Sequence, residues 1–254
     1  DYTTIPDSNF ENALYDLGYD DFNGDNKVPT ALVNTVQSLN VAYEGITDLT
    51  GIEAFVAMTS FDCRYNNLTS IDMTSNVLLD TFKCDNNSTL TSVNTSANTA
   101  LLYYEAYNCD LSIIDISNNL SLLNLEVYNN NLTSLDLSNH TSLEVLGSSD
   151  NNLTYLNIKN GNNSNTSNGE FDATGNTNLT CIEVDDVAYS TSTWTNVDGT
   201  ATFSNYCTYT SIPDSNFEAA LEALGYDDIS SDGQVPTALI NTVTTLDLDG
   251  ENIS

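Results

Sequence analysis

The sequence contains a single histidine, His140, in the stretch TSLDLSNHTSLEVL. A histidine acts as a general base in hydrolases when a serine or cysteine nucleophile and an orienting carboxylate surround it. No recognisable arrangement of that kind includes His140, and the many carboxylate pairs of the chain stand in no recognisable catalytic context. The sequence therefore predicts that the protein is not an enzyme.

The chain of 254 residues carries 36 acidic residues against four basic ones, for a formal net charge of −32. A surface this acidic repels phosphate, so nucleic acid and anionic membranes are unsuitable partners. No apolar run reaches the roughly 18 residues that a membrane helix needs, and no membrane insertion is expected. Divalent cations, cationic surfaces and neutral sugars remain as partners.

Alternating polar side chains in DFNGDNKV, and in its counterpart about 200 residues later, have the spacing of the first oxygen ligands of an EF-hand calcium loop. The twelfth position, where such loops have a bidentate glutamate, is Leu32 in the first copy and Leu239 in the second. Calcium is the only cofactor that the sequence suggests, and the alternative is an acidic turn between two helices. The candidate ligands are Asp21, Asn23, Asp25, Asp228, Ser230 and Asp232.

Two pairs of cysteines have different expected roles. Cys181 and Cys207 flank the only tryptophan, Trp194, and are predicted to form a disulfide, the alternative being two free thiols. The bond would close a loop of about 25 residues, contribute about 3 kcal/mol and imply an oxidising compartment. Cys63 and Cys84 occupy equivalent positions in adjacent repeats and are expected to be small buried apolar residues.

The elements that must position these residues come from an internal repeat. Five similar stretches begin 21 or 22 positions apart, at Phe61, Phe82, Tyr104, Leu125 and Leu146. This period indicates a leucine-rich repeat solenoid. Each repeat contains two short stretches of apolar residues two apart, such as Phe61 with Cys63 and Ile114 with Ile116. These stretches predict two short parallel β-strands in each coil of about 21 residues, with little helix.

An asparagine recurs where each coil must bend, since its amide can satisfy buried backbone groups. His140 and Cys109 occupy asparagine positions, so both are predicted to be structural. The first column contains Asn66, Asn87, Cys109, Asn130 and Asn151, and the second contains Asn76, Asn98, Asn119, His140 and Gly161.

The ends of the array differ from the repeats. A helix capped by Asp7 or Ser8 is expected near the start, with Phe10, Ala13, Leu14 and Leu17 on its apolar side. The stretch from Tyr209 repeats the start of the chain almost residue for residue. We therefore expect a second array after it, and a cap whose apolar face packs on the first array or on a neighbouring molecule by self-association. The expected domains are an amino-terminal cap at 1–35, the array at 36–180, a disulfide-closed cap at 181–207 and the duplicated cap at 208–254.

Outward positions of the first strand in each coil form the candidate ligand-binding surface. Tyr107 and Tyr128 are expected to be neighbours about 4.8 Å apart, because adjacent strands have that spacing. Tyrosines beside carboxylates can stack on sugar rings or anchor a protein partner. The alternative is an aromatic ladder that only stiffens the sheet. The candidate residues are Arg64, Lys83, Tyr103, Glu105, Tyr107, Glu126 and Tyr128.

A line of acidic and amide residues follows the second strands. Neighbouring carboxylates repel unless a cation or a hydrogen-bond donor lies between them. The line would therefore bind a cation, bond to adjacent hydroxyl groups such as those of Ser70 and Ser134, or stay solvated. Its members are Asp72, Asn94, Asp115, Asp136 and Asn157.

The stretches IPDSNFE, NNLTSLDLSN and NLTCIEVDDVAYSTSTWT resemble the secreted leucine-rich repeat proteins of Bacteroidetes, especially marine flavobacteria. The resemblance implies a secreted or cell-surface protein exported by the type nine secretion system, with a role in adhesion or ligand binding and no catalytic residues. We therefore expect an extracellular, non-enzymatic protein that recognises a protein or polysaccharide at the cell surface. The alternative is a structural spacer with no ligand of its own.

Overall fold

The computed structural model describes residues 1–21, 24–167, 169–248 and 253. It divides the chain into two units, Asp1–Phe203 and Ser204–Ser254. None of the described helices is long and apolar enough to cross a membrane.

The first unit begins with a small cap. Its elements are β1 (Tyr2–Thr4), α1 (Ser8–Asp16), β2 (Lys27–Pro29) and α2 (Thr30–Val33), with β1 and β2 antiparallel. The Asp7 carboxylate accepts hydrogen bonds from the backbone N–H groups of Asn9 and Phe10, which would otherwise lack partners at the start of α1. Phe10, Ala13 and Leu14 are buried as expected. Leu17 was wrongly placed on the apolar side, because α1 ends before it and its side chain is 47 % exposed.

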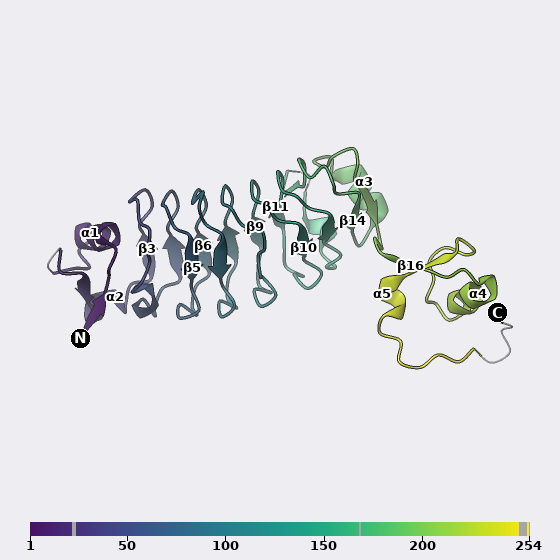
Figure 1. The fold of residues 1–254 in the computed structure, drawn as a ribbon, viewed down its shortest axis with the longest axis horizontal. Helices are drawn as coiled ribbons and strands as arrows, with labels where there is room; N and C mark the ends of the chain where they lie inside the picture. Colours follow the sequence, from purple (N-terminus) through teal and green to yellow (C-terminus); the bar gives the residue numbers. More distant parts are fainter. Residues whose placement is uncertain (22–23, 168, 249–252, 254) are drawn as a thin grey trace. The chain divides into compact units, whose positions relative to one another are not determined.

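Each following coil adds one strand to a parallel seven-stranded sheet, here called the first ladder (Figure 1). Its strands are β3 (Ser38–Asn40), β4 (Ser60–Asp62), β6 (Thr81–Lys83), β8 (Tyr103–Glu105), β9 (Asn124–Glu126), β11 (Val145–Gly147) and β13 (Phe171–Asp172). The register advances without a slip, so that Phe61 pairs with Phe82 and Phe82 with Tyr104. The predicted solenoid of parallel strands is confirmed.

A second ladder runs along the opposite strands of the coils and is interrupted. It consists of β5 (Ser70–Asp72) with β7 (Ser92–Asn94), and of β10 (Ser134–Asp136), β12 (Tyr155–Asn157), β14 (Cys181–Glu183) and β15 (Thr202–Ser204). Residues 114–116, predicted to form a strand here, lie between the two sheets without strand pairing. Ile114 and Ile116 nevertheless pack with the core, so the apolar contact is kept where the ladder hydrogen bonds are not.

The core lies between the ladders and is continuous from the cap to the last coil. Phe61, Phe82 and Tyr104 are fully buried, and their rings stack at centroid distances of 5.9 and 5.5 Å. Cys63 and Cys84 are buried free thiols, as expected, and burial raises the pKa of both. One coil could not bury such a face alone, so the repeats stabilise one another.

Asparagine side chains join each coil to the previous one. The Asn130 amide donates to the carbonyls of Ala106 at 2.8 Å and Val127 at 3.0 Å, and its oxygen accepts from the N–H of Leu111 at 3.0 Å. Equivalent bonds are made by Asn66, Asn87, Asn151 and Asn176 in the same column. Cys109 points its thiol at the same kind of carbonyl, 3.6 Å from Cys84 O. The structural role predicted for this column is confirmed.

The second column places His140 as predicted. Its Nε2 lies 3.2 Å from the carbonyl oxygen of Ile116, so this nitrogen must carry the proton that it donates. The next position belongs to Asn160, which donates to the His140 carbonyl at 3.0 Å. The assignment of that position to Gly161 was wrong by one residue, because an insertion after β12 begins at this point and breaks the period.

The last coils are closed by the insertion, which contains the 3₁₀ helix η2 (Asn163–Asn165), and by α3 (Val187–Thr193). Trp194 follows α3, is 2 % exposed, stacks on Phe171 at 4.4 Å and donates its indole N–H to Thr166 O at 2.9 Å. Cys181 and Cys207 form the predicted disulfide. A second 3₁₀ helix, η1 (Ile52–Ala54), lies near the other end of the array.

The second unit repeats the elements of the cap. They are β16 (Tyr209–Ser211), α4 (Ser215–Ala223), β17 (Gln234–Pro236) and α5 (Thr237–Ile240), with β16 and β17 antiparallel. Among its described residues, Ile212, Leu221 and Val235 form a buried cluster, against which Phe217 and Ile240 pack. An apolar groove of about 400 Å³ opens beside them. In the first unit, the counterparts of these residues are buried in the core of the array.

Removing the disulfide is expected to destabilise the end of the array. In a Cys181→Ala, Cys207→Ala variant, the free energy of unfolding should fall by about 3 kcal/mol, because the unfolded chain regains the freedom of a loop of about 25 residues. Urea titration followed by the fluorescence of Trp194, the only tryptophan, measures the change. Wild-type protein with reductant should match the variant; an unchanged midpoint in both would contradict the prediction.

The buried His140 predicts a pH dependence of stability. Burial lowers the pKa of His140 from its usual 6.5, although the bond to Ile116 O opposes this. Below that pH the unfolded chain binds a proton that the folded chain resists, so stability that is present above pH 6.5 is lost as the pH falls. Thermal melts of wild type and His140→Asn should therefore diverge between about pH 7.5 and 5, with the wild type losing more. Parallel curves would contradict the prediction.

Candidate binding surface on the first ladder

The outward side of the first ladder carries three columns of side chains, which together are called the strand face. The first of them, here called the middle column because it lies between the positions of Tyr103 and Tyr107, is formed by the last residue of each strand from β4 to β13. It contains Asp62, Lys83, Glu105, Glu126, Gly147 and Asp172. The column two residues later contains Arg64, Asp85, Tyr107, Tyr128 and Ser149. One residue further, each coil has a left-handed turn position, occupied by Tyr43, Tyr65, Asn86, Asn108, Asn129 and Asp150.

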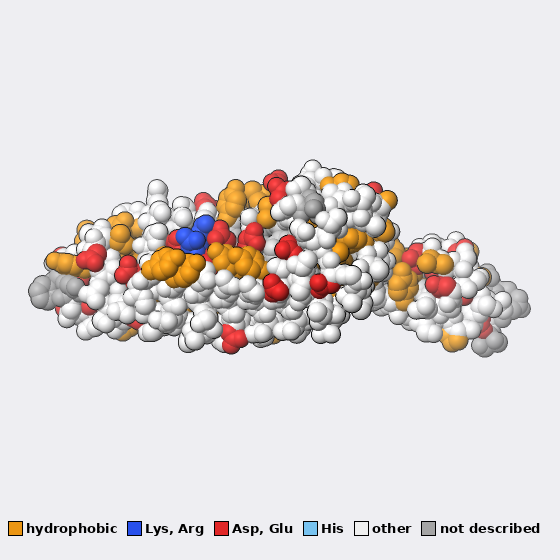
Figure 2. All heavy atoms as spheres, turned by 90° about the horizontal axis from the view of Figure 1, so that it is seen from above, with side chains coloured by type: hydrophobic (Ala, Val, Ile, Leu, Met, Phe, Trp, Pro, Cys, Tyr) orange, Lys and Arg blue, Asp and Glu red, His pale blue; other side chains and the backbone are white. Residues whose placement is uncertain are grey.

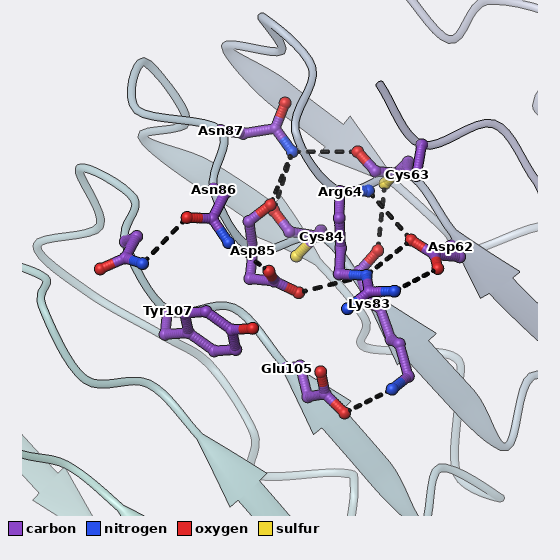
Figure 3. A network of polar contacts seen from close by, with 12 residues as sticks. Asp62, Cys63, Arg64, Lys83, Cys84, Asp85, Asn86, Asn87, Glu105 and Tyr107 are labelled. Atoms are coloured by element: carbon purple, nitrogen blue, oxygen red, sulfur yellow. Dashed lines mark hydrogen bonds and ion pairs between the residues drawn. The ribbon is translucent and has the colours of Figure 1, made fainter. Parts of the chain in front are cut away.

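Ion pairs of Arg64 and Lys83 fix the charged part of the strand face (Figure 3). Arg64 donates from Nε and Nη2 to the two oxygens of Asp62, both at 2.9 Å, and its Nε lies 3.8 Å from the buried carboxylate of Asp85. Lys83 reaches Glu105 in the next coil at 2.7 Å. Burial raises the pKa of Asp85, although Asn86, Tyr107 and Arg64 stabilise the ionised form. The basic side chains are thus held by carboxylates of the same surface.

Tyr107 and Tyr128 are neighbours, as the register predicted. Their rings stack with centroids 4.3 Å apart and an interplanar angle of 10°. Burial raises the pKa of Tyr107, and the negative charge of Asp85 adds to the effect. Tyr103 is 44 % exposed and lies two residues before Glu105 on β8, so it faces the same side.

A second tyrosine pair was not predicted. Tyr43 and Tyr65 stack with centroids 4.1 Å apart, although both have left-handed backbone angles, with φ of 68° and 55°. Bulky residues rarely adopt this conformation, whereas asparagine tolerates it. The later coils use asparagine here, and Asn108 donates to Asn86 at 2.9 Å. The available signal was a tyrosine directly before Asn66, where the later repeats have asparagine or aspartate.

The strand face therefore has exposed aromatic groups at two places. Tyr43 is 69 % and Tyr65 42 % exposed, and Tyr107 and Tyr128 are half-buried. Figure 2 shows basic side chains on one face of the molecule, with acidic and hydrophobic side chains beside them. Amphipathic rings next to fixed charges provide contact area and hydrogen-bonding groups for a ligand without a large cost in side-chain entropy.

A hollow of about 410 Å³ lies where the tyrosine stack ends. Gly147 leaves the middle column without a side chain, and Ser149 follows Tyr128 in the next column. The remaining walls include Glu126, Asp150, Glu170 and Asp172. Burial raises the pKa of Glu126, and the nearby carboxylates of Glu105 and Asp172 raise it further.

The candidate calcium ligands have partners within the protein. The hydroxyl of Tyr2 donates to Asp21 at 3.4 Å, and Lys27 forms an ion pair with Asp25 at 3.0 Å. Asn23 lies outside the described residues. In the second unit, Tyr209 donates to Asp228 at 3.1 Å, the N–H of Gln234 donates to Asp232 at 2.9 Å, and the hydroxyl of Ser230 bonds to Glu222.

The described residues of both acidic loops therefore have hydrogen bonds within the protein. The carboxylate of Glu11 accepts from the N–H groups of Asp25 and Asn26 at 2.9 and 2.6 Å. In the part of the chain that the structure describes, no three histidine, cysteine or acidic side chains are arranged to hold a metal ion. Calcium binding stays a prediction.

The acidic line on the second ladder has a local structural use. Asp72, Asp115 and Asp136 each accept a bond from the backbone N–H two residues later, at 3.0 Å. The expected partners Ser70 and Ser134 were wrong, because a side chain that precedes a turn reaches forward into it. The bonds from Ser117 lower the pKa of Asp115.

Comparisons with known proteins give structural matches only. No protein-family model and no curated protein matches the chain. The functional domain of InlJ from Listeria monocytogenes, whose description mentions a cysteine ladder, is 24 % identical with a TM-score of 0.39 over 72 % of this chain and 52 % of that one. Internalin C2 from the same organism is 16 % identical with a TM-score of 0.43, over 79 % and 95 % of the two chains.

A leucine-rich repeat protein from Leptospira interrogans is 16 % identical with a TM-score of 0.41, over 61 % of this chain and 51 % of its own. This chain thus spans about half the length of the InlJ domain and of the Leptospira protein. By its own period, ladders and asparagine columns, the chain is a leucine-rich repeat solenoid.

Proposed function

We propose that the protein is a non-enzymatic binding protein that attaches to a protein ligand through the strand face. The observation that carries the proposal is the combination of two stacked tyrosine pairs, one exposed and one half-buried, with fixed ion pairs on one parallel sheet. Tyrosine and arginine are enriched among the residues that dominate binding energy at protein interfaces. Because the side chains are already held in place, little ordering entropy is lost on binding.

A protein ligand fits the tyrosines better than a polysaccharide does. Sugar rings are bound by stacking on exposed aromatic faces, whereas each ring of the two pairs has one face covered by its neighbour. Edges and hydroxyl groups remain available, and these suit a polar protein surface. The ion pairs of Arg64 and Lys83 add charges of both signs, which favour a specific docking orientation.

We propose an extracellular location for the same protein. The Cys181–Cys207 disulfide is stable in an oxidising compartment, and the resemblance to secreted repeat proteins of Bacteroidetes points to export and to adhesion at a cell surface. The high net negative charge keeps such a protein soluble outside the cell.

The second candidate function is that of a spacer in a larger surface protein. The duplicated cap in Ser204–Ser254 favours it, because a repeated cap is what a tandem array of solenoids requires. A spacer would have no ligand of its own, so the two functions differ in whether the strand face binds anything.

The double variant Tyr107→Ala, Tyr128→Ala tests the proposed function. Truncating central interface tyrosines costs about 2 kcal/mol, so affinity for a ligand should fall at least about tenfold. Immobilised wild type and variant are compared by biolayer interferometry against cell-surface protein extracts and a polysaccharide panel. Tyr15→Ala is the control, since Tyr15 is an exposed tyrosine on the cap helix α1.

Binding that the double variant loses and Tyr15→Ala keeps, with both proteins folded, would support the proposal. Binding to polysaccharide alone would mean that the ligand is a sugar and not a protein. Equal binding by wild type and double variant would move the site elsewhere, and no binding by folded wild type would favour the spacer.

A further inference from the structure

The middle column of the strand face shows how the protein holds a cation. Lys83 extends toward the next coil and places its ammonium group 2.7 Å from Glu105. The following carboxylate, Glu126, lies one strand further on, in register with Glu105. Within the described part of the chain, Glu126 has no hydrogen-bond or ion-pair partner for its carboxylate.

The position after Glu126 is Gly147, and the Glu126 carboxylate occupies the space that a side chain would take there. Its φ lies outside the left-handed region, so its backbone conformation is open to any amino acid. A Cβ atom added at Gly147 would lie 1.9 Å from Oε2 of Glu126. Even alanine would therefore push the Glu126 carboxylate aside. The glycine keeps the hollow open and lets Glu126 lean across its floor.

The walls of the hollow combine negative charge with an aromatic ring. Glu126, Asp172 and Glu170 supply carboxylates, and Tyr128 lines the hollow while Tyr107, which covers one face of its ring, does not. Both kinds of wall attract a cation, because carboxylates are negatively charged and the face of an aromatic ring carries a negative electrostatic potential. Burial and the neighbouring carboxylates raise the pKa of Glu126, as expected of a charge that lacks compensation.

We propose that this hollow binds the cationic end of a lysine or arginine side chain from the protein partner of the strand face. The inference rests on the proposed function. The bound ammonium or guanidinium would repeat the Lys83–Glu105 contact further along the column, with Glu126 as its acceptor, Tyr128 beside it and Asp172 on the far side. The volume of about 410 Å³ accommodates the end of either side chain.

A basic side chain explains the hollow better than a metal ion does. Calcium requires about six to eight oxygen ligands at 2.3–2.6 Å. Among the described residues, no group of three suitable side chains is close enough to hold one. An organic cation needs fewer carboxylates and gains from the tyrosine, and the net charge of −32 draws basic partners toward the surface.

The test uses small probes on the full chain, so it does not depend on an identified partner. Nα-acetyl-lysine amide is titrated into ¹⁵N-labelled protein, with Nα-acetyl-norleucine amide as the uncharged control of similar length. The lysine probe should shift the backbone amide signals of Gly147 and its neighbours saturably, and the norleucine probe should not. Calcium chloride is titrated in a separate experiment.

Two variants with the same change in net charge separate the hollow from the general field of the protein. Glu126→Gln keeps the shape of the side chain and should weaken lysine-probe binding at least fivefold. Glu144→Gln removes an exposed carboxylate that does not line the hollow, and it should leave the affinity unchanged. Gly147→Ala should abolish the shifts, and a thermal melt of each variant shows that it is folded.

The inference would be overturned if the norleucine probe gave the same shifts as the lysine probe, or if both glutamine variants weakened lysine-probe binding equally. It would also be overturned if folded wild type gave no saturable shift. Tighter binding of calcium at the same amides would overturn it as well. The proposed function is judged separately by extract binding of Tyr107→Ala, Tyr128→Ala. Extract binding that this variant loses but Glu126→Gln fully keeps would leave the proposed function standing and the inference refuted.

Discussion

The structure depends on one requirement, that the backbone groups buried at each bend of the coil find hydrogen-bond partners. A coil of this length has no helix to satisfy them internally, so the amide of an asparagine does so from the next coil. The bonds of Asn130 to Ala106 and Val127 show the arrangement, because the side chain connects its own turn to the previous one. An unpaired buried amide or carbonyl would cost about 1–3 kcal/mol at every coil. The asparagine columns therefore fix both the shape of the bend and the stacking of the coils.

The regular stacking of the coils also determines how the outward side chains are arranged. When successive coils are related by nearly the same shift, any two outward residues at equivalent positions become neighbours. Tyr107 stacks on Tyr128 and Lys83 reaches Glu105 for this reason, and neither pair is formed by residues close in sequence. The core and the strand face are thus consequences of the same register. A residue can change on the outside without altering the hydrogen bonds that hold the coil.

The same regularity explains what the sequence could and could not predict. The period, the parallel ladders, the structural role of His140 and the Tyr107–Tyr128 contact follow from translating one coil onto the next. The predictions were wrong or incomplete where one coil does not repeat the one before it. The insertion after β12 moved the last asparagine position from Gly161 to Asn160, and the left-handed backbone of Tyr43 and Tyr65 has no signature in hydropathy. The hollow at Gly147 was not seen either, because a missing side chain becomes a cavity only when its neighbours are placed in three dimensions.

Gly147 also bears on how such a surface changes during evolution. The residue points away from the core, its backbone angle suits any amino acid, and the strand around it pairs on both sides. Replacing it would therefore alter the contour of the outer wall while the solenoid continues to fold. Because equivalent positions recur in every coil, glycine elsewhere in the column would open a comparable recess without disturbing its scaffold. A single outward substitution can thus change the contour of this surface while the ladder pairing of the strand is kept.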